Sequence, residues 1–360
     1  MIPPGWHRTP GAFLALSLLL AACAATPPAA VARATPESFA PLVKRVLPSV
    51  VNIAVTETVT GKDLLSEVPP ELRDTPLGRE FRRRFGDKRT ETTSAGSGFI
   101  IDSAGVIVTN RHVIEHATQI EVALSDGTEL PATVIGSDEL TDVAVIQVST
   151  THPLPAVSWG DSRTVEAGDW ILAAGNPFGL GGSVTAGIVS ALGRDLGAGP
   201  FDNFLQLDAP INPGNSGGPT FNMDGQVVGM TTAIVSPSGG SVGIGFAVPS
   251  EIIRPIVAEL RAKGRIDRGW LGVSLRDTEA PSSGVVIAEV QRSTPALRAG
   301  LRPGDVVIGI NGEAIDSSRA LIRAVAAVPP GESVRLRVRR QGRELEIPVT
   351  VGRRPESLTE

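Results

Sequence analysis

The sequence predicts a mainly β fold, and both its composition and its pattern of short apolar runs support that prediction. Glycine occurs 40 times and proline 29 times in 360 residues, and aromatic residues make up only 4% of the chain. This composition favours turns and short strands over long helices. Gly, Asp, Asn and Pro separate the runs, which is typical of a β-barrel or a β-sandwich. The first set of predicted strands is Ser49–Thr56, Gly98–Ile101, Val106–Thr109, Ile120–Leu124, Val143–Val148, Trp170–Ala174, Gly187–Ala191, Phe204–Leu207, Val227–Ala233 and Gly243–Val248.

A helix and then a second module follow this β-rich region. Apolar residues recur at helical spacing from Glu251 to Lys263, and Ser250 and Gly264 are suited to cap the two ends. We expect a linker at 259–268, a separate small domain at 269–352 and a tail at 353–360. The second domain carries strand-like runs at 271–275, 284–290, 305–310, 333–339 and 344–350, and one predicted helix at 318–328.

A long charged loop is predicted at 57–93, where the β pattern stops. Arginine and acidic residues are frequent in this stretch. Leu77, Phe81 and Phe85 recur every four residues, which would line one face of a helix. A mobile, solvated loop and a gating or docking loop both fit this composition.

The first 23 residues predict a targeting segment. His7 and Arg8 precede an apolar run that is too short to cross a bilayer comfortably. The run ends in LAAC at 20–23, which resembles the bacterial lipobox, in which the cysteine, here Cys23, is lipidated and becomes the mature N-terminus. An ordinary signal peptide or an uncleaved anchor is the alternative, and in each case the chain leaves the cytoplasm. Residues 24–37 are rich in Ala, Pro and Thr and predict a flexible tether.

The charge gives no support for a nucleic-acid partner, and the cysteine content excludes an internal disulfide. The formal net charge is −5, so bulk electrostatics give no reason to expect a nucleic-acid partner. Cys23 is the only cysteine, so no internal disulfide can form. A chain of this length can bury enough apolar surface to fold without one.

The segment 214–219, with the sequence GNSGGP, places a serine hydroxyl in a turn made of small residues. A nucleophile and its oxyanion hole require this combination at one place. The backbone N–H groups of Gly214 and Ser216 could point together at a developing oxyanion. Glycine at 217 and 218 allows the backbone to approach closely. A plain glycine-rich turn between two strands is the alternative.

The positions of the histidines restrict the class of serine enzyme. A serine nucleophile needs a base, and the base needs an orienting acid. All four histidines precede Ser216, which excludes an α/β-hydrolase, because that fold has its histidine after the serine. His112 follows one predicted strand and Asp142 precedes another, so the order is His, Asp, Ser, as in chymotrypsin-like enzymes. A turn aspartate is the alternative for Asp142.

A zinc-binding pattern competes for the same histidine. His112, Glu115 and His116 fit the H-x-x-E-H pattern of inverted zincins. That pattern needs a long amphipathic helix, whereas the β pattern resumes by Ile120. We therefore expect neither a metal nor a cofactor in this protein.

Three separated motifs resemble those of the HtrA/Deg family of trypsin-like serine proteases. They are TNRHVIEHA at 109–117, DELTDVAVIQV at 138–148 and DAPINPGNSGGP at 208–219, and GIGFAVPSEII at 243–253 is similar to the same family. The resemblance implies a chymotrypsin-like double six-stranded β-barrel protease domain at 38–258, followed by a small α/β PDZ domain. Only one PDZ domain fits before the chain ends.

The resemblance also implies roles for individual residues. His112 is the general base, Asp142 orients it, and Ser216 attacks the peptide carbonyl to form an acyl-enzyme. Gly214, Asn215 and Ser216 form the oxyanion hole. The specificity pocket is expected to involve Pro210, Met230, Thr231, Thr232 and Ala233. Pro210 stands where trypsin has a carboxylate, so we expect a preference for small aliphatic residues before the cleaved bond.

The sequence around Trp270, Leu271, Gly272 and Val273 resembles the carboxylate-binding loop of a PDZ domain. Backbone N–H groups there would hold a peptide C-terminus, and the peptide would add as a strand beside 272–275. The predicted helix from Ser318 would form the other wall of the groove. A generic small β module is the alternative.

Together these features predict an extracytoplasmic serine endopeptidase that cleaves misfolded or unfolded envelope proteins. We expect it to face the periplasm with a lipid anchor at Cys23, to form a homotrimer as the resemblance implies, and to respond to peptide C-termini at the PDZ groove. A soluble periplasmic protein or an N-terminally anchored one is the alternative location. A protease that cuts one membrane-anchored regulator and a peptide-binding chaperone are the alternative functions.

Overall fold

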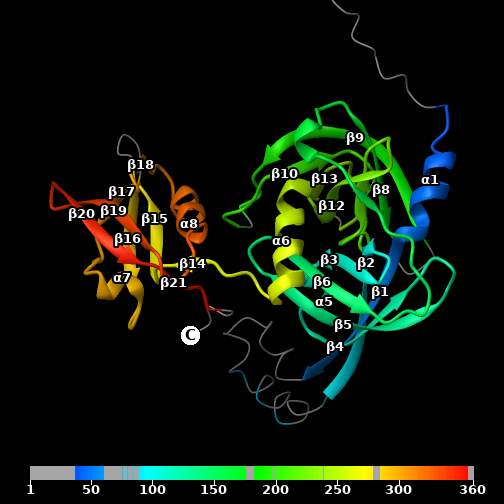
Figure 1. Cartoon of the computed structure of the whole chain (residues 1–360), viewed down its shortest axis with the longest axis horizontal. Helices are drawn as coiled ribbons and strands as arrows, with labels where there is room; N and C mark the ends of the chain where they lie inside the picture. The colour runs from blue at the N-terminus through cyan, green and yellow to red at the C-terminus, as the bar shows by residue number, and fades with distance from the viewer. Residues whose placement is uncertain are drawn as a thin grey trace, which may run out of the picture. The chain divides into compact units, whose positions relative to one another are not determined.

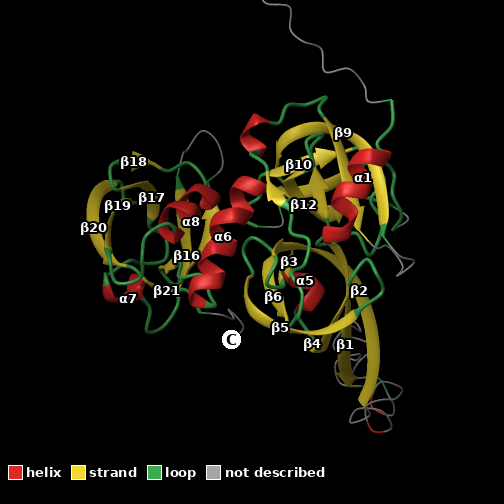
Figure 2. Cartoon of the chain, turned by 45° about the vertical axis from the view of Figure 1, so that its right-hand side comes forward, coloured by secondary structure: helices red, strands yellow, loops and turns green. Residues whose placement is uncertain are grey.

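The first of three folded units is a closed barrel, the ring of strands β1 to β6 in Figures 1 and 2. The computed structural model describes residues 37–60, 75, 79, 83, 89–175, 182–197, 199–237, 239–278 and 284–355. The barrel runs in the order β1-β2-β3-β6-β5-β4, and all its pairings are antiparallel. Its strands are β1 (Val50–Thr60), β2 (Arg89–Asp102), β3 (Val106–Asn110), β4 (Ala117–Ala123), β5 (Glu129–Asp138) and β6 (Val143–Val148).

A second six-stranded barrel follows, drawn in green in Figure 1. Its order is β11-β8-β9-β10-β13-β12, and a pairing between β11 and β12 closes it, while the short β7 (Ser158–Trp159) pairs with β12 from outside. The two barrels confirm the double-barrel fold expected from the sequence. The remaining strands are β8 (Trp170–Gly175), β9 (Ser183–Arg194), β10 (Phe204–Leu207), β11 (Pro219–Phe221), β12 (Gln226–Ile234) and β13 (Gly245–Pro249).

The predicted loop at 57–93 is shorter than expected at both ends. β1 and β2 continue their pairing to Thr60 and Arg89, which lie opposite each other at the end of a long hairpin. Threonine-rich sequence at both ends favours an extended strand, so Thr58–Thr60 and 89–93 belong to the barrel. The helical pattern of Leu77, Phe81 and Phe85 lies outside the described residues, as do the targeting segment, Cys23 and the tether up to residue 36. Within the described ranges, the structure contains no helix long and apolar enough to cross a membrane.

Helix α6 (Ser250–Lys263) closes the domain formed by the two barrels. It contacts β5 and β6 of the first barrel and β12 and β13 of the second. Leu260 is fully buried and lies against Gly136 of β5, so the last turn belongs to the domain. The linker predicted at 259–268 is therefore too long, because the helix continues to Lys263 and ends at Gly264, whose φ is 74°. The shorter helices of this domain are α1 (Ala40–Val46), α5 (Arg111–Ile114) and the 3-10 turns Leu47–Ser49 and Ser162–Thr164.

The C-terminal domain is a sheet covered by two helices. Its main strands run in the order β15-β16-β17-β19-β20, with β15 at one edge and the short β18 attached to β17. A buried apolar cluster that includes Leu271, Leu321 and Val334 fills the space between the sheet and the helices. The elements are β14 (Gly269–Trp270), β15 (Val273–Asp277), β16 (Val285–Val290), α7 (Pro295–Arg298), β17 (Val306–Ile310), β18 (Glu313–Ala314), α8 (Ser318–Ala326), β19 (Ser333–Arg340), β20 (Arg343–Thr350) and β21 (Gly352–Arg353).

A buried carboxylate in this domain is neutralised by one arginine. The Asp305 side chain is 1% exposed, and its oxygens lie 2.6 and 2.7 Å from Nε and Nη2 of Arg340. Burial raises the pKa of Asp305, but the hydrogen bonds from Arg340 and from the Arg302 N–H outweigh it, so the pKa lies below its usual value. The pair therefore stabilises the domain above the usual aspartate pKa, about 4, and loses this effect as the pH falls below it.

Replacing Arg340 by methionine is expected to destabilise the C-terminal domain by about 3–5 kcal/mol at pH 7, because a buried carboxylate loses its charge partner. Without Arg340, burial would raise the pKa of Asp305, so the difference from the wild type should begin to shrink above about pH 4 and should shrink further as the pH falls below it. Hydrogen exchange of the β17 and β19 amides measures both effects in the full chain. Arg337→Met, which removes an exposed arginine of the same strand, is the control. Equal exchange rates in the two variants would contradict the prediction.

Candidate active site

The His112 imidazole and the Asp142 carboxylate meet at the mouth of the first barrel. His112 lies in α5, directly after β3, and Asp142 directly precedes β6, the strand that pairs with β3. His112 Nδ1 lies 2.7 Å from Asp142 Oδ2, and the His112 backbone N–H donates to Asp142 Oδ1 at 2.9 Å. The carboxylate therefore fixes both the ring and its backbone, and the ring's Nε2 is left for another partner.

The backbone of Asp142 adopts a left-handed conformation, with φ of 54°. Aspartate and asparagine tolerate this region better than most residues. The Asp142 carbonyl accepts hydrogen bonds from Asn110 Nδ2 at 2.9 Å and from the Arg111 N–H at 3.1 Å. The Thr232 hydroxyl donates to Asp142 Oδ2 at 2.9 Å. Both barrels therefore contribute to the position of this carboxylate.

Ser216 lies in a tight turn between the two barrels, and the glycines after it are required by space. A Cβ on Gly217 would lie 2.2 Å from the Ser97 carbonyl oxygen, and φ at Gly217 is 83°. A Cβ on Gly218 would lie 2.1 Å from the Ala174 carbonyl oxygen. Both glycines are therefore needed for close backbone approach, as the sequence indicated.

The loop before Ser216 is braced by β2. The Ser97 hydroxyl donates to the Gly214 carbonyl at 2.6 Å, and the Ser97 N–H donates to the Ser216 carbonyl at 2.8 Å. Gly214 has φ of 98°. Among the described residues, the N–H groups of Gly214 and Ser216 have no protein acceptor. Two backbone donors two residues apart are thus free to bind an external oxygen.

The Ser216 hydroxyl is linked to Asp142 through Thr232 and not to His112 directly, within the described residues. Its Oγ donates to the Thr232 carbonyl over a long 3.4 Å, and Thr232 is the same residue whose side chain contacts Asp142. In the part of the chain that the structure describes, no hydrogen bond joins Ser216 to His112. Such bonds are often long without substrate and tighten when it binds.

Residues 96–230 match the family described as a trypsin-like peptidase domain, and residues 269–351 match the PDZ domain family. The chain is 41% identical over 355 residues to a probable periplasmic serine endoprotease DegP-like from Brucella suis biovar 1 (strain 1330), covering 88% of this chain and 69% of the relative.

A similar relative from Halomonas elongata carries the same description and is 40% identical over 368 residues, covering 96% of this chain and 76% of the relative. A solved structure described as the HtrA-type protease AlgW with decapeptide superposes with a TM-score of 0.76 at 38% identity, and covers 89% of this chain and 100% of that one. The chain belongs to the HtrA family of trypsin-like serine endopeptidases. The one PDZ domain agrees with the expectation from the sequence.

A cavity of about 320 Å³ lies beside His112 in this HtrA protease. Two of the residues expected in the specificity pocket, Thr232 and Ala233, line it, while Pro210, Met230 and Thr231 do not. Pro210 is exposed, whereas Met230 and Thr231 are completely buried. The cavity continues from His112 and Asp142 to the turn before Asp142, the loop before β10 and helix α6, which contribute Leu140, Leu196, Phe201, Asp202 and Ile252.

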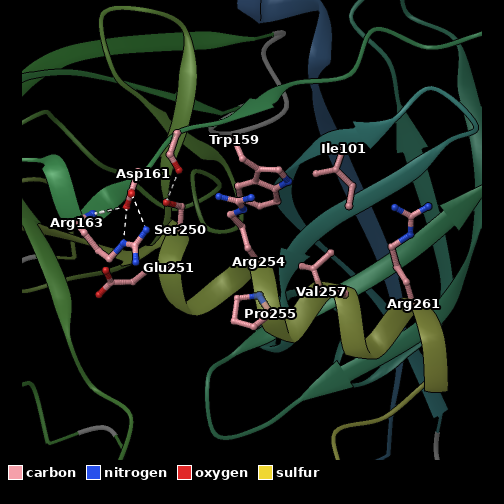
Figure 3. Close-up of a pocket in the computed structure, with 12 residues that line it drawn as sticks. Ile101, Trp159, Asp161, Arg163, Ser250, Glu251, Arg254, Pro255, Val257 and Arg261 are labelled. Atoms are coloured by element: carbon pink, nitrogen blue, oxygen red, sulfur yellow. Dashed lines mark hydrogen bonds and ion pairs between the residues drawn. The ribbon is translucent and has the colours of Figure 1, made fainter.

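A second cavity, of about 560 Å³, lies along α6 from Ser250 to Arg261 and contains none of the predicted site residues (Figure 3). Trp159 lies behind Arg254 in this view, and Arg163 points to Asp161. The hydrogen bonds from the Arg163 side chain and N–H lower the pKa of Asp161 to about 2. This pair is satisfied internally, and the cavity adds no group to the site at Ser216.

Two of the three H-x-x-E-H residues of this HtrA protease, His112 and Glu115, have partners other than a metal. Helix α5 has only four residues, and Glu115 pairs with Arg111 at 2.8 Å. His112 binds Asp142, as described above. The described residues contain no cluster of three side chains suited to hold a metal ion.

The loop Trp270–Val273 lies at the end of β15, next to an open sheet edge. Gly272 has φ of 78°, and a Cβ there would lie 2.3 Å from Thr294 Cγ2. The Leu271 and Gly272 carbonyls accept from Ala296 and Gln291, whereas their own N–H groups have no protein acceptor among the described residues. Helix α8 packs beside β15, and Asp277 of that strand caps it through the Ser318 N–H and hydroxyl.

Sequence analysis missed the residues that brace the site. Ser97 was not singled out, although it holds the loop before Ser216, and Thr109 donates to its carbonyl at 2.7 Å. Thr232 lines the cavity beside His112, and its hydroxyl also contacts Asp142, a contact that was not expected. A run of buried polar residues at a strand end, such as Thr109 and Asn110, is the signal that could have pointed to them.

Proposed function

We propose that this protein hydrolyses peptide bonds with His112, Asp142 and Ser216 as its catalytic triad. The observation that supports this assignment most strongly is the 2.7 Å contact between His112 Nδ1 and Asp142 Oδ2. Thr232 links Asp142 to Ser216, which stands before two sterically required glycines. His112 takes the proton from Ser216 Oγ as the oxygen attacks the carbonyl carbon, and later gives it to the leaving amine. Water then hydrolyses the acyl-enzyme by the same route in reverse.

The oxyanion of the tetrahedral intermediate is bound by the N–H groups of Gly214 and Ser216, which Asn215 joins. Their freedom from protein acceptors supports this role. The brace from Ser97 to the Gly214 carbonyl holds the peptide plane, so that little reorganisation is needed during the reaction. One such donor contributes about 3 kcal/mol to transition-state stabilisation.

A serine-directed fluorophosphonate tests the proposed function directly. The reagent should label Ser216, as located by mass spectrometry, and should abolish cleavage of casein. A chelator applied under the same conditions should leave cleavage unchanged. Labelling at another residue, or loss of activity to the chelator alone, would contradict the triad assignment.

The residue before the cleaved bond is proposed to be small and aliphatic, such as Val, Ala or Ile. Pro210 offers no carboxylate to a basic side chain, and Thr232 and Ala233, the expected pocket residues that line the cavity beside His112, are uncharged. An uncharged pocket of modest size discriminates against Lys and Arg, because their charge would be desolvated without a partner.

The PDZ domain is proposed to bind peptide C-termini and to modulate the activity. The free N–H groups of Leu271 and Gly272 suit a carboxylate, and the open edge of β15 suits an added strand. Solved relatives described as HtrA-type protease AlgW with decapeptide and with tripeptide support a peptide ligand.

Replacing Gly272 by valine is expected to weaken binding of a fluorescent peptide with a free C-terminus about tenfold to 100-fold, because a side chain there meets Thr294 and strains a positive φ. Fluorescence anisotropy of the full chain measures this. Gly300→Val is the matched control, since Gly300 has a similar φ of 80° but no neighbour within 4 Å of its Cβ position. Equal weakening in both variants would contradict the location of the site.

The biological setting proposed for this protease is the periplasm, where it removes unfolded or misfolded proteins. The relatives described as probable periplasmic serine endoproteases support this location. The sequence LAAC at 20–23 supports attachment to a membrane through a lipid on Cys23. A homotrimer is proposed on family resemblance.

A further inference from the structure

An arginine outside the triad is buried beside the turn that leads to Asp142. Arg268 ends the segment between α6 and β14, and its Nη2 lies 2.7 Å from Asp138 Oδ2 at the end of β5. The two side chains are only 7% and 8% exposed. Burial lowers the pKa of Arg268 and the Asp138 carboxylate opposes this, but an arginine keeps its charge in proteins. The two residues therefore form a desolvated ion pair.

Asp138 in turn holds the residue that precedes Asp142. Its Oδ2 accepts from the Thr141 N–H at 3.1 Å and from the Thr141 hydroxyl. Thr141 is itself buried, and the next residue is Asp142 with its left-handed backbone. Two sets of contacts therefore fix the direction of the Asp142 carboxylate. The Asp142 backbone carbonyl accepts hydrogen bonds, and the preceding residue, Thr141, is held by Asp138.

Arg268 also contacts the loop on the other side of the catalytic cavity. Its guanidinium lies over the Phe201 ring, 4.6 Å from the centroid. Phe201 and Thr141 both line the cavity beside His112. Arg268 Nε is buried and has no hydrogen-bond partner within the described residues. A buried pair with an unsatisfied nitrogen adds little to stability, because desolvation offsets the Coulomb attraction.

We propose that Arg268 is a positioning residue for the triad, which fixes the turn 138–142, and through it the Asp142 carboxylate, against His112. The proposal rests on the triad assigned above. Arg268 lies just before the residues that match the PDZ domain, so the segment joining the two domains contributes directly to the geometry of the catalytic centre.

Replacing Arg268 by methionine tests the proposal. The unpaired Asp138 carboxylate is expected to turn towards water and displace Asp142, and a misplacement of about 1 Å can lower a rate about 100-fold. We expect kcat for a reporter peptide to fall about tenfold to 100-fold while KM changes less than about threefold. The rate at which a fluorophosphonate labels Ser216 should fall by a similar factor, since this reaction needs the activated serine and no peptide contacts.

A double variant separates positioning from general stability. In Asp138→Asn with Arg268→Met, the amide oxygen still accepts the Thr141 N–H, and no charge is left unpaired. Most of the lost kcat should return. Arg265→Met is the matched control, because Arg265 pairs with Asp267 in the same segment but is 51% exposed, and its kcat should equal that of the wild type.

Three results would overturn the proposal: an unchanged or raised kcat in Arg268→Met, a fall that Arg265→Met reproduces, or a double variant as slow as the single one. If Arg268→Met does not fold, the double variant still tests the proposal. The proposal then requires the double variant to be both folded and active. A wild type that neither cleaves casein nor takes the label would instead refute the proposed function.

Discussion

Replacing Ser216 by alanine is expected to lower kcat for casein or a reporter peptide by about 10⁶-fold, the scale found when a triad nucleophile is removed. The fold should survive, because the contacts that hold this turn use the backbone. The Ser216 carbonyl accepts from Ser97, and the glycines at 217 and 218 are unchanged. The hydroxyl itself has one long hydrogen bond of 3.4 Å to lose.

The measurement is steady-state cleavage at matched concentrations of folded protein, with unfolding midpoints recorded for each variant. Ser190→Ala, at an exposed serine of β9, is the control and should retain full activity. Ser216→Ala should also keep its affinity for peptide substrates, because this substitution removes an interaction that is made only during the reaction. Residual activity within tenfold of the wild type would show that another group is the nucleophile.

Replacing Asp142 by asparagine is expected to lower kcat by about 10⁴-fold at neutral pH. The backbone should tolerate the change, because asparagine also adopts a left-handed φ such as the 54° seen here. The side-chain amide of the variant cannot serve both the Thr232 hydroxyl and His112 Nδ1 as the carboxylate does. Oδ2 accepts from the Thr232 hydroxyl and faces His112 Nδ1, and an NH₂ group there would favour the wrong tautomer of the ring.

The control for this variant is Asp126→Asn. Asp126 also accepts a backbone N–H, from Thr128 at 2.9 Å, but lies in an exposed turn of the same barrel. Its activity should equal that of the wild type. Fluorophosphonate labelling of Asp142→Asn should slow together with peptide cleavage, because both need His112 as a base. If the fluorophosphonate labelled Asp142→Asn at the wild-type rate while peptide cleavage was slow, Asp142 would not act in the chemical step.

Much of the site could be predicted from sequence because its chemistry depends on short motifs. The order of His112, Asp142 and Ser216 and the glycines after the serine indicated a chymotrypsin-like arrangement, and the structure brings the first two residues into contact. The double barrel was predictable in outline, since most strands are apolar runs bounded by turn residues.

Some elements escaped the sequence because they lack a core-facing pattern. Only two of the ten residues of β5 are buried, and the strand includes Pro131 and Gly136, so no apolar run marks it. β7 and β11 have two and three residues, too few to show alternation. Without β5 the Asp138 turn could not be placed, and the contact from Arg268 could not be foreseen, because 130 residues separate the two partners.

The open edge of β15 also bears on the behaviour of the folded protein at high concentration. An unpaired strand edge can template association between identical molecules. β15 has five residues, and its exposed positions include Ser274, Arg276 and Asp277. A short edge that carries one positive and one negative side chain is a poor template for the repeated strand pairing that leads to aggregation. Five residues are still enough to pair with a few residues of a chain end. The same strand can therefore stay open for ligands without making the protein aggregate.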